Sequence, residues 1–151
     1  SRVSRGLGDV YKRQGIKKAI SYFKNPILQF HGDESQDFCA SFNLPYIKAI
    51  SMNEKDFQNK IIEFGDAFAI LLDSGGQKIR GGTGKTFDWK LIPKEIKNNL
   101  IIAGGLNSNN ITSLIKSYKP YGVDLASGVE SKPGKKDIAE LKHFLKIIDE
   151  I

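Results

Sequence analysis

The chain has 151 residues, of which 40% are hydrophobic and 26% are charged, as in one soluble globular domain and unlike disordered, collagenous or membrane chains. No apolar run approaches the roughly 20 residues that cross a bilayer, and no apolar segment follows the first arginines as a secretory signal requires. We therefore expect a cytoplasmic protein without a membrane partner. The single cysteine, Cys39, excludes an internal disulfide and a multi-cysteine zinc site, and no metal is expected.

The net charge of +6 is unevenly distributed along the chain. Residues 1–14 contain four basic residues and one aspartate, so they contribute +3 of it. The remaining lysines are spread along expected helical faces, without an aromatic platform or a nucleic-acid motif. Dispersed surface lysine is usually a solvated face, and we expect no nucleic-acid partner.

Residues 1–14 show neither helical nor alternating periodicity, and they resemble the translated junction sequence found at broken ends of assembled reading frames. We expect them to be a non-native or disordered leader that takes no part in the fold. The domain is expected to comprise residues 15–151.

From Gly15 onward, short apolar runs alternate with amphipathic stretches, which is typical of repeated strand–helix units around a parallel sheet. Helices are also expected to begin near Asp88 and Pro93, where capping residues occur. Five such units fit an open doubly wound sheet or part of an eight-stranded barrel, and topology alone does not decide between them. Strands are expected at 27–31, 46–50, 67–72, 100–103 and 122–126, and helices at 16–23, 35–43, 54–64, 111–118 and 137–151.

In either architecture, ligands bind at the carboxyl ends of the strands. A glycine pair and a Ser-Gly pair follow two consecutive strands, where glycine would let main-chain amides approach a phosphate closely. These residues predict a phosphate site, and plain turn glycines are the alternative. The four residues concerned are Gly104, Gly105, Ser127 and Gly128.

Two carboxylates and one imidazole complete the set of candidate site residues. Asp73 ends an apolar strand, where it serves either as an acid or base or as a loop cap. Asp124 falls inside the expected strand 122–126, where an unpaired charge is costly, so it contacts either a substrate or a buried partner. His31 also ends a strand, but a lone histidine is more often satisfied by its surroundings.

The glycine-rich loop after Asp73 contains Gly84-Lys85-Thr86, which resembles the end of a nucleotide-binding P-loop. The spacing fails, because Ile79 stands where that motif needs a glycine. In addition, Phe87-Asp88-Trp89 follows where a helix should begin. We therefore do not expect a nucleotide triphosphatase, and the alternative from the residues alone is a flexible connection.

Several segments together resemble phosphoribosylanthranilate isomerase, over residues 15–151. The two most discriminating are Gly-Gly-Thr-Gly-Lys-Thr-Phe-Asp-Trp at 81–89 and Asp-Leu-Ala-Ser-Gly-Val-Glu at 124–130. The others are Leu-Gln-Phe-His-Gly at 28–32, Ile-Lys-Ala-Ile at 47–50, Leu-Leu-Asp-Ser at 71–74, Ala-Gly-Gly-Leu-Asn at 103–107 and Pro-Gly-Lys-Lys at 133–136.

The resemblance implies a (βα)8 TIM barrel, of which this chain would hold the last five strand–helix units. It implies an Amadori rearrangement in tryptophan biosynthesis, in which N-(5-phosphoribosyl)anthranilate becomes 1-(2-carboxyphenylamino)-1-deoxyribulose 5-phosphate without a cofactor. This chemistry needs one acid and one base. Asp73 matches the general acid, and the Gly104–Gly105 and Ser127–Gly128 turns match the phosphate site. The resemblance also implies that the glycine-rich loop covers the sugar-phosphate substrate, and Asp124 and His31 are assigned to substrate binding.

The family's general base is a cysteine in a Lys-Ile-Cys-Gly-like motif, which this sequence does not contain. Cys39 falls in an expected helix and is interpreted as a core residue. We therefore expect a truncated chain that is inactive alone, with unpaired edges at strands 27–31 and 122–126. The alternatives are another phosphate-binding barrel, such as an indole-glycerol-phosphate synthase or an epimerase, and a non-catalytic phosphosugar-binding or inert fragment.

Overall fold

The computed structural model describes residues 2–73 and 89–151. The first half contains α1 (Arg2–Ile20), β1 (Leu28–Phe30), α2 (Gln36–Ala40), β2 (Tyr46–Ser51), α3 (Phe57–Glu63) and β3 (Ala69–Asp73). The second half contains η1 (Trp89–Leu91), β4 (Asn99–Ala103), α4 (Ile111–Tyr118), β5 (Gly122–Asp124), η2 (Ser127–Val129), β6 (Glu130–Lys132), β7 (Lys135–Lys136) and α5 (Ile138–Asp149).

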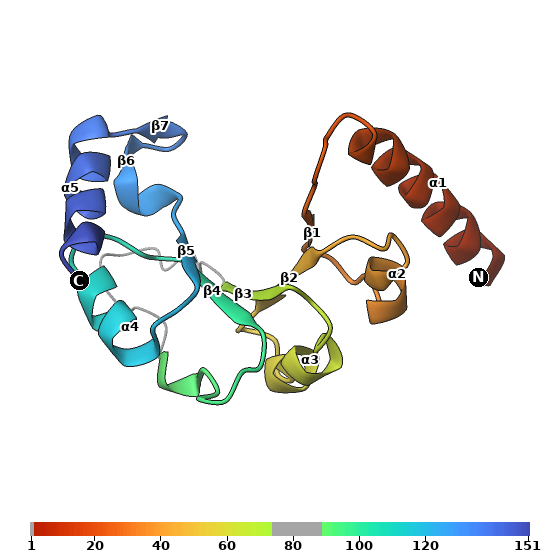
Figure 1. The fold of residues 1–151 in the computed structure, drawn as a ribbon, viewed down its shortest axis with the longest axis horizontal. Coiled ribbons are helices and arrows are strands. Elements are labelled where there is room, and N and C mark those ends of the chain that lie inside the picture. The colour runs from red at the N-terminus through yellow and green to blue at the C-terminus, as the bar shows by residue number, and fades with distance from the viewer. Residues whose placement is uncertain (1, 74–88) are drawn as a thin grey trace.

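The five strands β1 to β5 form one parallel sheet in the order of the sequence. Right-handed crossovers between strands in consecutive order place all the connecting helices on one face. A doubly wound sheet instead needs a point where the strand order reverses. Figure 1 shows α2, α3 and α4 following the outer curve of the sheet. The order therefore decides in favour of a barrel-type sheet, which the sequence pattern left open.

The hydrophobic core lies between the sheet and these helices. Ile70 and Leu72 of β3 are fully buried there, together with Leu114 of α4 and Phe144 of α5. Full burial of such side chains stabilises the fold by about 1.5–3 kcal/mol each. Burial of an apolar stripe favours the helix Ile138–Asp149. Asp137 caps this helix, because its carboxylate accepts hydrogen bonds from the N–H groups of Ala139 and Glu140.

The opposite face of the sheet carries the alternate residues of each strand. Ala49, Leu71 and Ile101 lie in register across β2, β3 and β4 on this face. Within the described residues, β1 pairs with β2 alone and β5 pairs with β4 alone. The predicted free edges are thereby confirmed for this part of the chain.

Residues 2–20 form one helix, whereas the sequence predicted a helix from residue 16 and no regular structure before it. The expectation of a disordered leader is therefore wrong for residues 2–14, and their non-native origin stays a prediction. One contact to the rest of the molecule comes from Arg13. Its guanidinium lies 4.7 Å from the centroid of the Phe38 ring and donates a 2.6 Å hydrogen bond to Ser41 Oγ. The guanidinium also lies 5.9 Å from the Phe42 ring centroid. Cation–π contacts of this kind leave no periodic signal in a sequence.

Three further predictions need correction or lie outside the described residues. No helix begins at Pro93, because the chain runs irregularly from there to β4. β5 ends at Asp124 instead of residue 126, since the chain turns into η2. The hairpin of β6 and β7 was missed, although Gly134 has the positive φ of 78° that its turn uses. The expected cap at Asp88 lies outside the described residues.

Candidate active site

A row of four residues crosses the carboxyl end of the sheet. Ser51, Asp73, Ala103 and Asp124 are direct register partners across β2, β3, β4 and β5. Register partners project from the same face, which is the face opposite the fully buried Leu72. At the usual strand spacing, the backbones of Asp73 and Asp124 are about 10 Å apart. The sheet therefore brings the two predicted carboxylates to one end and one face.

Asp73 is positioned by the most deeply buried strand of the sheet. The residues before it in β3 are all buried, and Asp73 itself is half-buried. Its main-chain carbonyl accepts a 2.9 Å hydrogen bond from the N–H of Met52, which continues the pairing with β2 to the end of the strand. This hydrogen bond fixes the main chain from which the Asp73 carboxylate projects. The glycine-rich loop that follows, including Gly84 and Lys85, lies outside the described residues, so its covering role stays a prediction.

Asp124 is exposed and is the last residue of β5. The prediction that it lies inside an apolar strand is wrong, because the strand stops there at the edge of the sheet. The argument from the cost of a buried charge therefore does not apply to Asp124. Its place in the row beside Ala103 and Asp73 still leaves it on the ligand end of the sheet.

The glycine pair after β4 forms a turn that needs glycine. Gly104 and Gly105 have φ values of 87° and 65°, in the left-handed region that residues with a Cβ avoid. The side chain of Asn110 holds this turn, because its Nδ2 donates a 2.9 Å hydrogen bond to the carbonyl of Gly105. Its Oδ1 accepts a 2.9 Å bond from the N–H of Asn107. The turn is thus fixed from the start of α4.

The Ser127–Gly128 turn lies directly against the loop after β4. A Cβ added to Gly128 would be 1.7 Å from the carbonyl oxygen of Leu106. The two predicted phosphate turns are therefore in contact, at the ends of neighbouring strands. Adjoining turns without side chains leave main-chain groups accessible to an anion.

Lys136 contacts the segment before the Ser127–Gly128 turn and was not among the predicted site residues. Its Nζ donates hydrogen bonds of 2.6 Å to the carbonyl of Ala126 and 2.9 Å to Glu130 Oε1. The Lys136 hydrogen bond also lowers the pKa of the Glu130 carboxyl. Lys136 thus holds the start of the turn that contains Ser127. The Pro-Gly pair before it signalled a hairpin, but nothing in the spacing indicated which carbonyl the lysine reaches.

His31 is not brought together with these residues. It follows β1 at the other edge of the sheet and is exposed. Four strand spacings separate β1 from β5, or about 19 Å along the sheet. His31 shares the carboxyl end with the row but lies away from the phosphate turns.

Cys39 lies in α2, on the helix side of the sheet, and is completely buried. Burial raises the pKa of its thiol to about 11. A protonated thiol in the core has no access to a ligand at the strand ends. The interpretation of Cys39 as a core residue is confirmed.

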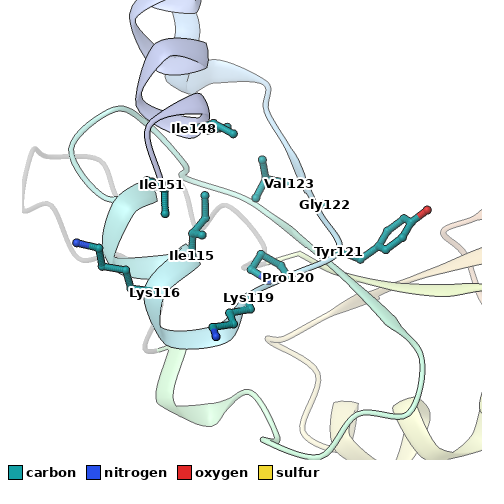
Figure 2. A pocket seen from close by; sticks show the side chains of 9 residues that line it. All are labelled: Ile115, Lys116, Lys119, Pro120, Tyr121, Gly122, Val123, Ile148 and Ile151. Carbon is teal, nitrogen blue, oxygen red and sulfur yellow. The ribbon is translucent and has the colours of Figure 1, made fainter.

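An apolar groove of about 560 Å³ lies at the opposite end of β5 from this site. Figure 2 shows the side chain of Tyr121 pointing away from the other lining residues. Because the groove opens at the amino end of β5, it does not belong to the candidate site. Its walls are Ile115, Lys116, Lys119, Pro120, Tyr121, Gly122, Val123, Ile148 and Ile151.

Residues 2–73 and 89–151 contain no helix long and apolar enough to span a membrane. The same ranges contain no group of three or more His, Cys, Asp or Glu side chains that would hold a metal ion.

Comparison with known proteins gives one consistent family. The profile described as N-(5′phosphoribosyl)anthranilate (PRA) isomerase matches residues 12–147. The N-(5′-phosphoribosyl)anthranilate isomerase of Legionella pneumophila (strain Corby) is 50% identical over 134 residues, which cover 88% of this chain and 65% of that protein. The Cellvibrio japonicus (strain Ueda107) enzyme is 45% identical over 131 residues, or 86% of this chain and 61% of that protein. The chain thus spans less than two thirds of these relatives.

Solved structures agree with this result. Phosphoribosyl anthranilate isomerase from Thermotoga maritima matches with a TM-score of 0.77 and 34% identity, over 91% of this chain and 68% of that one. A phosphoribosyl anthranilate isomerase in complex with reduced 1-(o-carboxyphenylamino)-1-deoxyribulose 5-phosphate matches with a TM-score of 0.73 and 31% identity, over 91% and 66%. These proteins have the TIM-barrel fold, which agrees with the consecutive strand order of the sheet.

Proposed function

Because the chain belongs to the N-(5′-phosphoribosyl)anthranilate isomerase family, we propose that its strand ends serve the Amadori rearrangement of N-(5-phosphoribosyl)anthranilate in tryptophan biosynthesis. The observation that carries the proposal is the row that places Asp73 beside two adjoining glycine turns. Asp73 offers a carboxyl group, and the turns that follow β4 and β5 offer main-chain groups for a phosphate. We assign the reaction to the cytoplasm, without a cofactor.

In this proposal, the 5-phosphate binds at the turns of Gly104–Gly105 and Ser127–Gly128, where main-chain amides favour its negative charge. Asp73 acts as the general acid. It gives its proton to the ring oxygen as the bond from that oxygen to C1 breaks, and the nitrogen lone pair forms a C1–N double bond. A base then removes the proton from C2, and the resulting enol becomes the ketose. Asp124 and His31 contact the substrate.

The base in this scheme is not Cys39, whose thiol is buried on the far side of the sheet. The expectation that the chain is inactive alone follows from this gap. The alignments give it no support, since they cover 88% of the chain at 50% identity to an isomerase. Inactivity of the chain alone therefore stays a prediction, which a turnover measurement decides.

Family membership favours the isomerase over other phosphate-binding barrels. The non-catalytic alternative, a phosphosugar-binding chain, shares the glycine turns and differs in chemistry. Two measurements on the purified chain separate them: conversion of phosphoribosylanthranilate to the ketose, followed by chromatography, and calorimetric binding of the reduced product analogue. Conversion supports the isomerase. Because the isomerase is itself expected to be inactive as this chain alone, conversion is also measured in the chain extended by the first strands of the Legionella pneumophila relative. Binding without conversion in both chains supports the phosphosugar-binding chain. A folded chain that neither binds nor converts contradicts the assignment of these strand ends to the substrate.

A further inference from the structure

Lys48 is a charged residue in an apolar layer. It lies in the middle of β2 and is 3% exposed. Its neighbours on the same face, Tyr46 and Ile50, are core residues, so Lys48 points to the helix side of the sheet. None of the proposed chemistry uses it, because the row with Asp73 lies on the opposite face.

The ammonium group of Lys48 reaches back to the loop after β1. Nζ donates a 2.6 Å hydrogen bond to the carbonyl of Gly32, and lies 3.2 Å from Glu34 Oε2 and 3.5 Å from the Glu34 carbonyl. The centroid of the Phe64 ring lies 4.9 Å from Nζ, within cation–π range. A buried ammonium is tolerated because these groups replace its water.

Glu34 completes the arrangement on the other side of Gly32. Its Oε2 accepts a 2.9 Å hydrogen bond from the Gly32 N–H. Burial raises the pKa of the Glu34 carboxyl. Hydrogen bonds from its own N–H, from Lys48 and from Gly32 together lower it by more than burial raises it, so the net pKa is below the usual range. The charged pair therefore holds both main-chain groups of Gly32, the donor and the acceptor.

The buried pair is weak evidence for a gain in stability, because replacing such a pair by apolar side chains is often neutral or stabilising. We therefore consider which conformation it specifies. The conformation specified here is that of Gly32, which directly follows His31 at the carboxyl end of β1. The loop is exposed and would otherwise be fixed by few apolar contacts.

We propose that Lys48 is a positioning residue, which fixes the His31–Gly32 loop at the ligand end of the sheet from the opposite face. The inference rests on the proposed function only for the identity of the ligand that the loop contacts. The position of the loop itself is independent of that function. The two claims are tested by separate measurements on the same variants.

The first measurement follows the loop by NMR in the 151-residue chain. The sequence contains two histidines, so ¹³C labelling at the imidazole gives one signal for His31 and one for His143 on α5. In Lys48→Met, which keeps the stem and removes the charge, the His31 signal shifts and narrows while the His143 signal stays unchanged. Lys48→Arg retains the wild-type His31 signal. An unchanged His31 signal in a folded Lys48→Met variant overturns the inference.

The control is Lys146→Met, which removes the same charge from the exposed pair of Lys146 and Glu150 at the end of α5. It should leave the His31 signal in place. If Lys48→Met does not fold, Glu34→Gln replaces it, because this change weakens the hold on the Gly32 N–H while the lysine remains. A His31 signal that is insensitive to Glu34→Gln as well contradicts the positioning role.

The second measurement compares two ligands by calorimetry, the reduced product analogue and inorganic phosphate. Lys48→Met should raise the Kd of the analogue about tenfold, or about 1.4 kcal/mol. The Kd of inorganic phosphate should stay within about twofold, because the predicted phosphate turns follow β4 and β5, which lie three and four strand positions from β1. Equal analogue affinity in a variant whose His31 signal has moved overturns the link to the ligand. If the wild-type chain binds no analogue, the proposed function fails and the NMR result alone decides the positioning claim.

Discussion

Gly128 lies so close to the main chain of Leu106 that position 128 has no room for a side chain. A Cβ on Gly128 would lie 1.7 Å from the carbonyl oxygen of Leu106 and 2.8 Å from its carbonyl carbon. Gly128 does not have the positive φ of Gly104 and Gly105. The position therefore needs glycine for its small volume, and the loops that hold the two predicted phosphate turns touch through this contact.

The first prediction concerns Gly128→Ala. The added methyl meets main-chain atoms, which cannot rotate away, so one of the two turns must shift. We expect a loss of about 1–3 kcal/mol in the free energy of unfolding, as for other overpacked sites. The Kd for inorganic phosphate should rise more than about tenfold, the equivalent of 1.4 kcal/mol. Urea denaturation and calorimetric titration measure the two effects.

The control for this change is Gly15→Ala. Gly15 lies inside α1 with nothing within 4 Å of an added Cβ. Alanine there should stabilise the helix by up to about 1 kcal/mol and leave phosphate affinity unchanged. Wild-type phosphate affinity in Gly128→Ala would show that the contact with Leu106 is unrelated to the anion.

The second prediction concerns Asp73→Asn in a chain extended at residue 15 by the first strands of the Legionella pneumophila relative. An amide keeps the shape of the carboxyl group but cannot give up a proton to the ring oxygen. Turnover of phosphoribosylanthranilate should fall by about 10²–10⁴-fold, the usual range for loss of a general acid. The affinity for the reduced analogue should survive. Full activity in the variant contradicts the assignment of Asp73 as the acid.

The third prediction concerns the thiol of Cys39. With a pKa of about 11 and complete burial, the thiolate is scarce at pH 8 and no reagent reaches it. Iodoacetamide should alkylate the folded chain at least about a hundredfold more slowly than the chain in urea. Mass spectrometry of the modified chain measures the rates. Rapid modification of the folded chain would contradict the burial of α2 against the sheet.

The fourth prediction concerns pH and Glu34. The folded-state pKa of Glu34 lies below its unfolded value, so the ionised form stabilises the fold above the unfolded pKa. This contribution is lost as the pH falls through the folded value. The free energy of unfolding should therefore decline less between pH 6 and pH 3 in Glu34→Gln than in the wild type. At pH 7 the variant should be less stable by about 1–3 kcal/mol, as expected for a lost charged hydrogen bond.

Glu150→Gln serves as the control for Glu34→Gln. Glu150 faces Lys146 at 3.8 Å with both side chains largely exposed. Loss of an exposed pair changes stability by less than about 0.5 kcal/mol. Parallel pH curves for the wild type and Glu34→Gln would show that the carboxylate does not hold the Gly32 loop in solution.

The sequence predicted the parts of the fold that have periodic signals. The helix at 111–118 was predicted with the bounds that α4 has, because its apolar stripe faces the core, and all five strands were located. Contacts without a periodic signal were missed, such as the cation–π contact of Arg13 and the reach of Lys136 to Ala126. The sequence pattern also did not predict how deeply a residue at the end of a strand is buried. Asp73 and Asp124 look alike in sequence, yet Asp73 ends a central strand and Asp124 ends an edge strand.

The consecutive strand order also governs how the chain can fold. Paired residues are 18 positions apart between β1 and β2, as for Leu28 and Tyr46, and 30 apart between β3 and β4, as for Ala69 and Asn99. Loop-closure entropy grows slowly with length, so closing the longer loop costs only about 0.5 kcal/mol more. All described pairings of the sheet join strands that are consecutive in the sequence. Each strand can join the sheet soon after it leaves the ribosome, and the glycine-rich segment between β3 and β4 is the widest gap that such stepwise growth must cross.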